Sequence, residues 1–424
     1  MELSKRLLVQ EEGRYLQWST GEAFYCIADT AWEMLHKGSL PDIQRYLDIR
    51  KEQGFNTILM VALAELDGME ARNPQGHVPT QEEYWKDLDQ ILAAAGERGM
   101  VIALLPTWGD KWNRQQGVGP EFFNPENAYQ YGEWIGKRYR DTWNLFWVLG
   151  GDRPIQTREQ ERTIDAMAGG LKQGDQGQHL ITFHPCGAAS SVDFVKNKSY
   201  IDFHSIQSGH GLECYDSAEM LRRTWQEEHK PVFDMECRYE DFPACFRVDL
   251  DGWTDADVRN NLYWNLMQGA MGAAYGHRDV WRLASGTEQG EGVSDLPGEA
   301  WQTMLRRPAA EQIRYLARLR MMRPYYELRP APELIGRDED RLPGQGCIAA
   351  ARGEKYAYFY TGLGLPVHAE LRSLGCSCVR CTWYSPRDGK SIEGGIVRAD
   401  QRVFAAPSSG RGNDWVLILD NMDQ

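Results

Sequence analysis

The chain has no apolar run of about eighteen residues, the length that a membrane-spanning helix needs. Its first twelve residues, MELSKRLLVQEE, lack the apolar core and cleavage site of a secretory signal, so we expect a cytoplasmic protein. Basic charge is also scarce, because 47 Lys and Arg against 61 Asp and Glu give a net charge of −14. Nucleic acids and anionic membranes attract basic surfaces, so we expect neither as a partner.

Motifs for cofactors and metals are missing as well. No Gly-x-Gly-x-x-Gly follows the first apolar run, and no pair of histidines has the spacing of a zinc-binding helix. The nine cysteines, an odd count, are typical of reduced thiols. Three of them form the cluster Cys376-Ser-Cys378-Val-Arg-Cys381, which lacks a second ligand pair. We therefore predict no metal and no cofactor.

The composition is that of an ordinary globular protein, with 42% of the 424 residues hydrophobic and 25% charged. A typical α/β barrel takes about 250 residues, so the length allows one barrel and a smaller domain. The first part of the chain alternates short apolar runs with segments of helical period. The eight runs that we predict as strands are residues 24–28, 57–62, 101–106, 145–149, 180–184, 201–206, 232–235 and 273–276.

Between these runs, apolar residues recur with the spacing of amphipathic helices. Tyr84, Leu88 and Ile91 fall on one face of such a segment, which Gly99 ends. Near-continuous apolar strands separated by helices are typical of a parallel sheet covered on both faces. Eight such units favour a closed (β/α)8 TIM barrel over an open sheet. We therefore predict an α/β fold whose catalytic barrel occupies residues 1–328.

The pattern changes after the helical segment that ends near Arg323. A stretch rich in proline, glycine and aspartate runs to Gly346, and short segments separated by turn signals follow it. We expect a small C-terminal antiparallel β-sandwich over residues 329–424. Its predicted strands are residues 347–351, 356–361, 369–374, 379–384 and 414–419.

Two of the predicted barrel strands end on a carboxylate beside an arginine. One ends with Gly-Gly-Asp152-Arg153 and the other with Glu236-Cys-Arg238. Barrel enzymes keep catalytic groups at the carboxyl ends of strands, and cleavage of a glycosidic bond requires two carboxyl groups. Asp152 is also a good helix N-cap, and Glu236 is also suited to a buried ion pair. We favour the catalytic interpretation of both, and we expect Arg238 to hold Glu236 anionic.

The other predicted strand ends carry aromatic and hydrogen-bonding side chains. Aromatic rings stack on the C–H faces of sugars, and Asp, His, Arg and Gln bind hydroxyl groups. Taken singly, the tryptophans fit packing equally well, although 15 is a high count. The residues that we expect to bind substrate are Asp29, Trp32, Trp108, Arg153, His184, Gln207, His210, Arg238, Tyr239, His277 and Trp281.

At these positions the chain closely resembles a family of bacterial glycoside hydrolases that includes apiosidases. These are barrel enzymes followed by a β-domain that carries a collagen-binding label. The resemblance extends over nearly the whole chain, in order. The stretches that carry it are DTAWE at 29–33, ALLPTWGD at 103–110, FNPENAY at 123–129, WVLGGDR at 147–153, IQSGH at 206–210, RYE at 238–240 and YGH at 275–277.

The resemblance implies that Asp152 is the general acid/base and Glu236 the nucleophile. Two departures from related enzymes bear on the substrate more than on the reaction. Many related barrel glycosidases end the fourth strand in Asn-Glu, whereas here Asp152 supplies a shorter acid. Met235 and Cys237 flank Glu236 where the family pattern has Gly and Pro, which alters the floor of the pocket.

We predict a glycoside hydrolase, retaining and exo-acting, that releases a terminal sugar from plant-derived oligosaccharides or glycosides. Apiose is the leading candidate sugar, and a small saccharide is the expected partner. The alternatives are a non-catalytic carbohydrate-binding protein and a glycosidase of other specificity, such as an arabinofuranosidase or rhamnosidase. A binding protein has no need of two buried acids, which favours the enzyme. A metal-dependent amidohydrolase would need histidines on the first strand, where Asp29-Thr-Ala-Trp32 supplies none.

Overall fold

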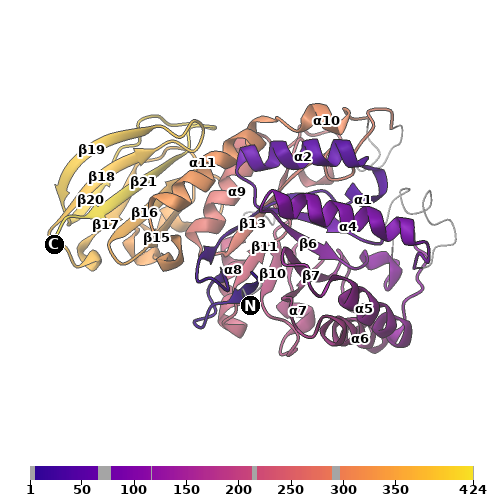
Figure 1. Cartoon of the computed structure of the whole chain (residues 1–424). Coiled ribbons are helices and arrows are strands. Elements are labelled where there is room, and N and C mark those ends of the chain that lie inside the picture. Colours follow the sequence, from indigo (N-terminus) through magenta and orange to yellow (C-terminus); the bar gives the residue numbers. More distant parts are fainter. Residues whose placement is uncertain (1–4, 65–77, 116, 213–216, 289–296, 424) are drawn as a thin grey trace.

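The computed structural model describes residues 5–64, 78–115, 117–212, 217–288 and 297–423. The chain forms a larger barrel and a smaller β-domain of C-terminal residues, which lie side by side (Figure 1). Within the described ranges, no helix is both long and apolar enough to cross a membrane.

Eight parallel strands build the barrel in the described residues, hydrogen-bonded in the order β8-β7-β6-β5-β4-β13-β11-β10. The ring closes where the backbone N–H of Asp202 donates to the carbonyl of Ile181, the first residue of β8, at 2.9 Å. The predicted (β/α)8 barrel is therefore confirmed. The strands are β4 (Cys26–Thr30), β5 (Thr57–Val61), β6 (Val101–Leu105), β7 (Leu145–Gly150), β8 (Ile181–His184), β10 (His204–Gln207), β11 (Val232–Asp234) and β13 (Gly272–His277).

Alternation of side chains between two apolar layers explains why most barrel strands are apolar along their length, with β10 (His204–Gln207) as an exception. On β5, Ile58 and Met60 pack in the layer that faces the helices, whereas Leu59 and Val61 pack in the barrel interior. Because both faces of a parallel strand are covered, polar residues have no favourable position within it. The predicted strands were located from this property.

Helices cover the outside of the barrel (Figure 1). Asn124 caps α5, because its side-chain oxygen accepts from the backbone N–H groups of Glu126 and Asn127 at 3.0 and 3.1 Å. The described helices are α1 (Met34–Lys37), α2 (Leu40–Gln53), α4 (Glu82–Glu97), α5 (Pro125–Tyr139), α6 (Arg158–Asp175), α7 (Val192–Val195), α8 (Ser217–Glu228), α9 (Asp255–Met267), α10 (Trp301–Met304) and α11 (Pro308–Met322).

Two predicted barrel strands begin later than expected. The run at 24–28 is divided, since Phe24 ends β3 of a small antiparallel sheet and Cys26 begins β4. The run at 201–206 starts with buried residues that precede β10, which begins at His204. Burial without strand pairing therefore misplaced both boundaries. The small sheet consists of β1 (Leu7–Val9), β2 (Leu16–Trp18) and β3 (Ala23–Phe24), and β9 (Ala189–Ser190) and β12 (Tyr239–Glu240) are short additions to the barrel sheet.

The β-domain has a larger and a smaller antiparallel sheet, ordered β14-β15-β16-β21-β18-β19 and β17-β20. Side chains of both sheets share one apolar core, among them Phe359 and Leu417 from the larger sheet and Val367 and Phe404 from the smaller. This is the predicted sandwich. The strands are β14 (Arg329–Pro330), β15 (Ile348–Arg352), β16 (Tyr356–Thr361), β17 (Val367–Glu370), β18 (Cys378–Tyr384), β19 (Ser391–Arg398), β20 (Gln401–Phe404) and β21 (Trp415–Asn421).

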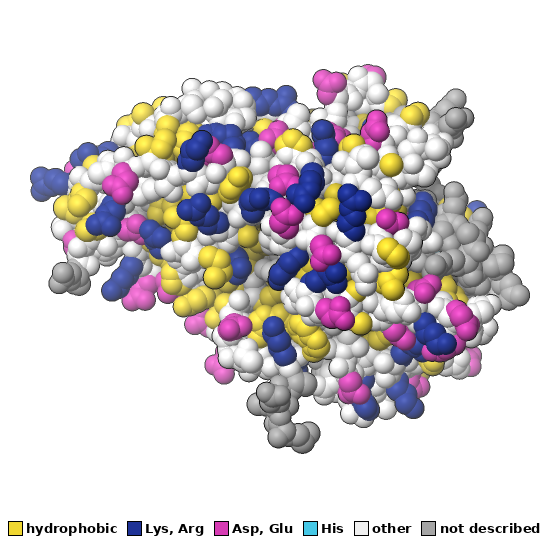
Figure 2. All heavy atoms as spheres, turned by 45° about the horizontal axis from the view of Figure 1, so that its top comes forward, with side chains coloured by type: hydrophobic (Ala, Val, Ile, Leu, Met, Phe, Trp, Pro, Cys, Tyr) yellow, Lys and Arg dark blue, Asp and Glu magenta, His cyan; other side chains and the backbone are white. Residues whose placement is uncertain are grey.

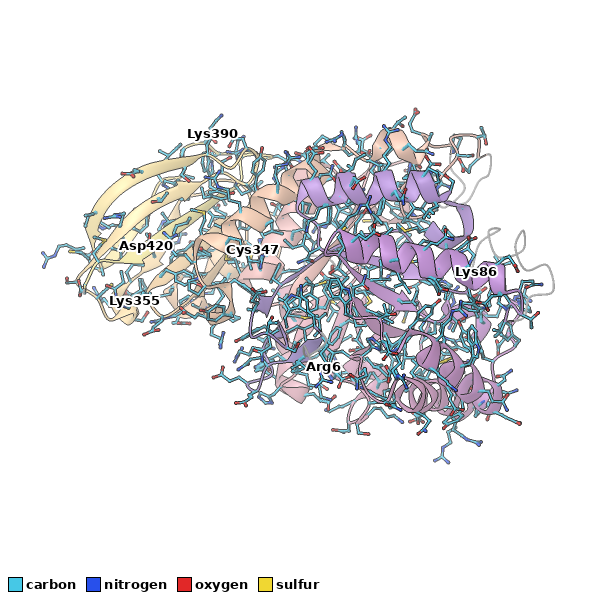
Figure 3. The ribbon with its side chains drawn as sticks, in the orientation of Figure 1. Arg6, Lys86, Cys347, Lys355, Lys390 and Asp420 are labelled. Carbon is cyan, nitrogen blue, oxygen red and sulfur yellow. The ribbon has the colours of Figure 1, made fainter. Side chains whose placement is uncertain are left out.

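The outer face of the larger sheet packs on the barrel through α9. Tyr360 stacks on Tyr263 with ring centroids 5.2 Å apart, and a buried ion pair joins Arg259 to Asp414 at 2.8 Å. Cys347 lies at this junction, where its carbonyl accepts from the Trp264 ring N–H at 3.4 Å (Figure 3). Helix α9 is consequently buried on all sides, although its sequence period predicts one buried face. The predicted domain boundary at 328/329 stays a prediction.

The surface mixes charges of both signs. On the face that Figure 2 shows, basic and acidic side chains alternate over both parts of the molecule. Acidic and basic side chains are thus interspersed on this face, with apolar side chains between them.

Candidate active site

A pocket of about 880 Å³ opens at the carboxyl ends of the barrel strands. Asp152 follows β7, and Glu236 follows β11. Gln207 is the last residue of β10, and the residues up to Leu212 come directly after it. Most of the side chains predicted from strand ends thus converge at one place. The predicted residues that line the pocket are Trp32, Trp108, Asp152, Arg153, Gln207, His210, Glu236, Tyr239 and Trp281.

Glu236 is the buried acid of this pocket, with only 7% of its surface exposed. The His210 Nε2 atom lies 2.9 Å from Glu236 Oε1, and the His184 Nε2 atom lies 3.2 Å from Oε2. Each carboxylate oxygen therefore faces one imidazole. The histidines come from the ends of β10 and β8, so the curvature of the barrel brings them to the same acid.

The contacts of His184 fix which of its nitrogens carries hydrogen. The backbone N–H of Asp152 donates to His184 Nδ1 at 3.1 Å, so Nδ1 is an acceptor. The neutral ring then carries its hydrogen on Nε2, the atom that faces Glu236. The ring also contacts Trp32 and Trp108 at centroid distances of 5.5 and 6.0 Å. His184 thus connects the backbone of one candidate acid to the side chain of the other.

The electrostatics of Glu236 favour its ionised form. Burial raises the pKa of this carboxyl, but the hydrogen bond with His210 and the close contact with His184 outweigh burial and lower the pKa well below its ordinary value of 4.5. The expectation that Arg238 holds Glu236 anionic is wrong. Its guanidinium donates to the carbonyl of Asp257 at 3.1 Å and lies over the Trp253 ring, and the two histidines act on Glu236 instead.

Asp152 is carried by a turn that depends on two glycines. Gly150, Gly151 and Asp152 have φ of +90°, +95° and +57°, all in the left-handed region. A Cβ on Gly150 would lie 2.3 Å from the His184 carbonyl oxygen, and one on Gly151 would lie 2.5 Å from a backbone nitrogen. Only glycine fits both positions without strain. The turn leaves the Asp152 side chain 36% exposed in the pocket, with Arg153 Nη1 at 3.3 Å from its Oδ2.

Four predicted substrate-binding residues do not line the pocket. One of them, His184, is fully buried and contacts Glu236 as described above, and the other three make contacts elsewhere. Asp29 is fully buried in an ion pair with Arg50 from α2. His277 Nε2 lies 3.0 Å from Asp241, and its Nδ1 accepts the backbone N–H of Asp279 at 3.0 Å. Arg238 packs against α9, as described above. These three side chains support the loops around the pocket rather than the pocket itself.

Helix α9 holds the segment that carries Glu236 on both of its sides. Before Glu236, the Asp234 carboxylate accepts from Asn265 at 2.7 Å and from the Ser208 hydroxyl at 2.8 Å. After Glu236, Arg238 donates to the Asp257 carbonyl at 3.1 Å. Asn265 and Asp257 both belong to α9, whose far face is held by the β-domain. Sequence reasoning missed this arrangement because no local pattern links a helix to a strand end.

Several lining residues were also missed. They lie in loops beyond the strand ends, and a position relative to a strand is the signal that located the others. These residues are Gln115, Cys186, Leu212, Phe242, Cys245 and Phe246.

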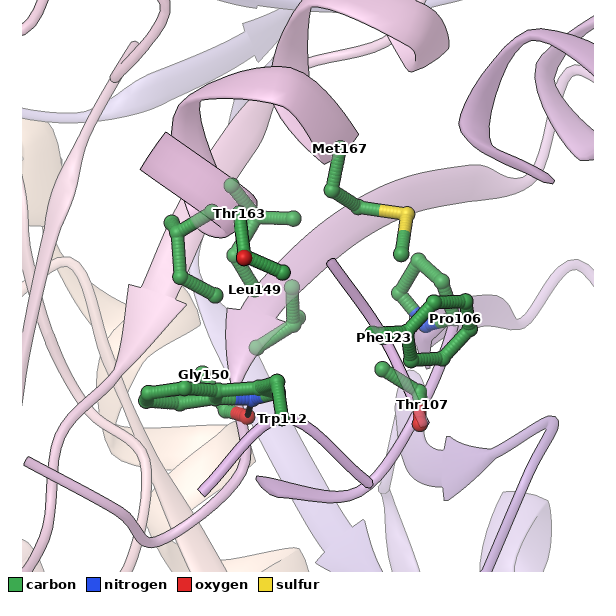
Figure 4. A pocket seen from close by; sticks show the side chains of 10 residues that line it. Pro106, Thr107, Trp112, Phe123, Leu149, Gly150, Thr163 and Met167 are labelled. Atoms are coloured by element: carbon green, nitrogen blue, oxygen red, sulfur yellow. Dashed lines mark hydrogen bonds between the residues drawn. The ribbon is translucent and has the colours of Figure 1, made fainter. Parts of the chain in front are cut away.

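A second, closed cavity of about 10 Å³ lies behind β7 (Figure 4). Its lining includes Trp112, Thr163 and Met167, and the Trp112 ring N–H donates to the Gly150 carbonyl at 2.9 Å. A space of this size holds at most about one water molecule, so it is a packing gap. The hydrogen bond from the Trp112 ring beside it supports the turn that carries Asp152.

Several buried polar atoms of the pocket lining have no hydrogen-bond partner among the described residues. Among them are Trp108 Nε1, Gln207 Oε1, His210 Nδ1, Trp281 Nε1 and the Tyr239 hydroxyl oxygen. Buried groups of this kind normally find a partner, so they are suited to a ligand with several hydroxyl groups. Over the same part of the chain, no cluster of three or more His, Cys, Asp or Glu side chains is arranged for a metal ion.

A TIM barrel with two strand-end carboxyl groups and tryptophans in one pocket defines the class of barrel glycoside hydrolases. The chain matches the family model of the apiosidase-like catalytic domain over residues 10–327, and it belongs to that family. Residues 330–420 match the model described as "putative collagen-binding domain of a collagenase". No curated protein sequence matches the chain.

Solved structures extend the comparison. A glycoside hydrolase of family 5 from Bacteroides vulgatus ATCC 8482 is 27% identical, with a TM-score of 0.87 over 98% of this chain and 94% of its own. A structure titled only "Glycoside hydrolase" is 26% identical, with a TM-score of 0.87 over 99% of this chain and 98% of its own. A family 5 mannosidase from Rhizomucor miehei shares the fold alone, at 11% identity, a TM-score of 0.51, and coverage of 75% and 97%. The protein is thus a glycoside hydrolase with an apiosidase-like domain.

Proposed function

We propose that this glycoside hydrolase is retaining, with Glu236 as nucleophile and Asp152 as general acid/base. The observation that carries the proposal is the buried Glu236 carboxylate, which two histidines keep ionised. A nucleophile must be ionised before it attacks, and a carboxylate that already accepts hydrogen bonds is also held in a fixed orientation.

In the first step, a Glu236 oxygen attacks the anomeric carbon while Asp152 donates its proton to the departing glycosidic oxygen. The bond from the anomeric carbon to that oxygen breaks, and the leaving group departs as an alcohol. In the second step, Asp152 takes a proton from water, whose oxygen displaces Glu236 from the anomeric carbon. The exposure of Asp152 supports this role, because both the leaving group and the water must reach it. We expect the two carboxyl groups to lie about 5–5.5 Å apart, as in retaining enzymes.

The proposed mode is exo, and what supports it is that Glu236 is only 7% exposed while other residues that line the same pocket are largely exposed. A terminal sugar is the part of a substrate that fits a closed end. The unpartnered polar atoms of Trp108, Gln207, His210 and Trp281 are placed to bind its hydroxyl groups. Apiose is the leading candidate sugar, on the strength of the family, and plant-derived glycosides in the cytoplasm are its proposed source.

A panel of aryl glycosides tests the proposal. It should include the β-apioside, α-arabinofuranoside and α-rhamnoside, each assayed with wild-type protein, Glu236→Gln and Asp152→Asn. We expect turnover of the apioside and loss of at least about a hundredfold in either variant, because each loses a catalytic carboxyl group. Turnover that survives in both variants would refute the assigned roles, and hydrolysis of another sugar alone would refute the assigned specificity.

A further inference from the structure

The mouth of the active-site pocket has a different chemistry from its floor. Leu212 and Phe246 both line the pocket, yet 65% and 55% of their surfaces are exposed. Single exposed apolar side chains are common on protein surfaces, but here two of them line the same pocket. Glu236, by contrast, is exposed to only 7% and is surrounded by hydrogen-bonding groups. The pocket is therefore polar at its buried end and apolar at its rim.

The backbone that presents Phe246 is strained. Cys245 and Phe246 have φ of +57° and +59°, so two consecutive residues with side chains adopt the left-handed conformation. The strain is held in place by the Cys245 N–H, which donates to the His210 carbonyl at 3.0 Å, and by pairing of Pro243 with Gly252. Strained conformations of this kind persist where the surrounding structure enforces them, and they concentrate at functional sites.

Phe246 belongs to an aromatic group that leads from the rim to the nucleophile. Its ring lies 5.5 Å from Phe242 and 5.6 Å from His210, and the His210 ring contacts Phe242 at 4.5 Å. His210 in turn bonds to Glu236. A substrate could therefore place its sugar against Glu236 and an apolar group against Phe246 while both parts stay inside the same pocket. The volume of about 880 Å³ is at the upper end of the range for pockets that enclose whole small ligands, and it exceeds the need of one sugar.

We propose that the rim formed by Leu212 and Phe246 binds an apolar, aromatic aglycone, so that the substrate is a glycoside of an aromatic alcohol. The inference rests on the proposed exo mode, in which the sugar fills the buried end and the leaving group extends through the mouth. A second sugar can also stack on an aromatic ring, but it would be expected to meet hydroxyl-binding groups beside that ring, and the side chains of Leu212 and Phe246 offer none.

Binding of 2-naphthylmethanol, an uncharged aromatic alcohol without a sugar, tests the rim independently of catalysis. Isothermal titration should show saturable binding to the wild-type protein. Phe246→Ser and Leu212→Ser should each weaken it by about fivefold, the loss expected for one aromatic or aliphatic contact. The control is Ile396→Ser on the β-domain, where Ile396 is similarly exposed at 58% and should not matter. Equal affinity for the alcohol in wild type and both rim variants would overturn the proposal. So would a neutral disaccharide whose affinity falls more in Phe246→Ser than the affinity for the alcohol does.

Kinetics on the sugar that the panel identifies supplies the second test. The ratio of kcat/KM for the naphthylmethyl glycoside to that for the methyl glycoside is measured in wild type and in Phe246→Ser, so that differences in intrinsic reactivity cancel. We expect the ratio to fall about fivefold in the variant. An unchanged ratio would refute aglycone binding while leaving the glycosidase assignment intact. Failure to hydrolyse any glycoside, with Phe246-dependent binding of the alcohol retained, would refute the proposed function instead.

Discussion

Replacement of His210 by phenylalanine should move the acidic limb of the pH–activity profile to higher pH. His210 Nε2 lies 2.9 Å from Glu236 Oε1, and the imidazole ring packs against Tyr239 and Phe242 at 4.4 and 4.5 Å. A phenyl ring keeps this packing and removes the hydrogen bond and the electrostatic effect of the imidazole on Glu236. The burial of Glu236 stays, and burial by itself raises the pKa of a carboxyl group.

The size of the effect follows from the hydrogen bond that is lost. A hydrogen bond to a charged group contributes about 1.5–3 kcal/mol, and one pKa unit corresponds to about 1.36 kcal/mol. The limb should therefore rise by about one to two pH units. The effect on stability has the same sign. The pKa of Glu236 is lower in the folded protein than in the unfolded chain, so ionised Glu236 stabilises the fold at pH values above its unfolded pKa. That stabilisation is lost as the pH falls through the folded pKa.

The assay is the pH dependence of kcat/KM, which reports ionisation in the free enzyme. His210→Gln retains an N–H donor and should recover part of the shift. His368→Phe is the control, because His368 lies on β17 of the β-domain and pairs with Asp340 at 3.0 Å. An acidic limb that stays in place in His210→Phe would refute the account of how Glu236 is kept ionised.

Three further predictions concern the supports of the site. Arg259→Met should lower the free energy of unfolding by about 3 kcal/mol in urea titrations, since it removes the nearer of the two arginines that pair with the buried Asp414. Arg247→Met, at an exposed ion pair, should cost less than about 1 kcal/mol. Gly151→Ala should reduce kcat/KM by at least about a hundredfold, since the added Cβ would lie 2.5 Å from a backbone atom. Gly177 also has a positive φ but has open space around it, so Gly177→Ala should retain activity. Equal activities of the two variants would contradict the role of the turn. Dialysis against EDTA should leave turnover unchanged, and loss of turnover that one divalent ion restores would require a metal-dependent mechanism.

The fold could be predicted from sequence because its strands are apolar on both faces. Runs such as 57–62 and 101–106 need burial on both sides, and alternation with helices leaves few architectures. The edge of the β-domain could not be found in this way. Strand β19 is exposed along its length and contains Gly394 and Gly395, so it has neither the alternation nor the composition of a strand.

The site was predictable to the extent that strand ends determine it. Asp152 and Glu236 were located by that rule, but the partners of Glu236 were not. Arg238 would lie on the same strand face as Glu236 only if the strand continued past both residues. Strand β11 ends at Asp234, before either of them. Asp29 was expected to follow a strand as the catalytic candidates do, but it lies within β4, where Arg50 from α2 pairs with it. Which strand-end carboxylates face the pocket depends on helices and loops that the local sequence does not specify.

The central claim is that Glu236 attacks the sugar, and trapping the glycosyl-enzyme tests it most directly. The wild-type protein is treated with a 2-fluoro glycoside of the sugar that the panel identifies, bearing an activated leaving group, and its peptides are mapped by mass spectrometry. The account predicts one added fluorosugar on the peptide that contains Glu236, and none in Glu236→Gln. A sugar attached to Asp152, or hydrolysis with inverted configuration and no adduct, would contradict it.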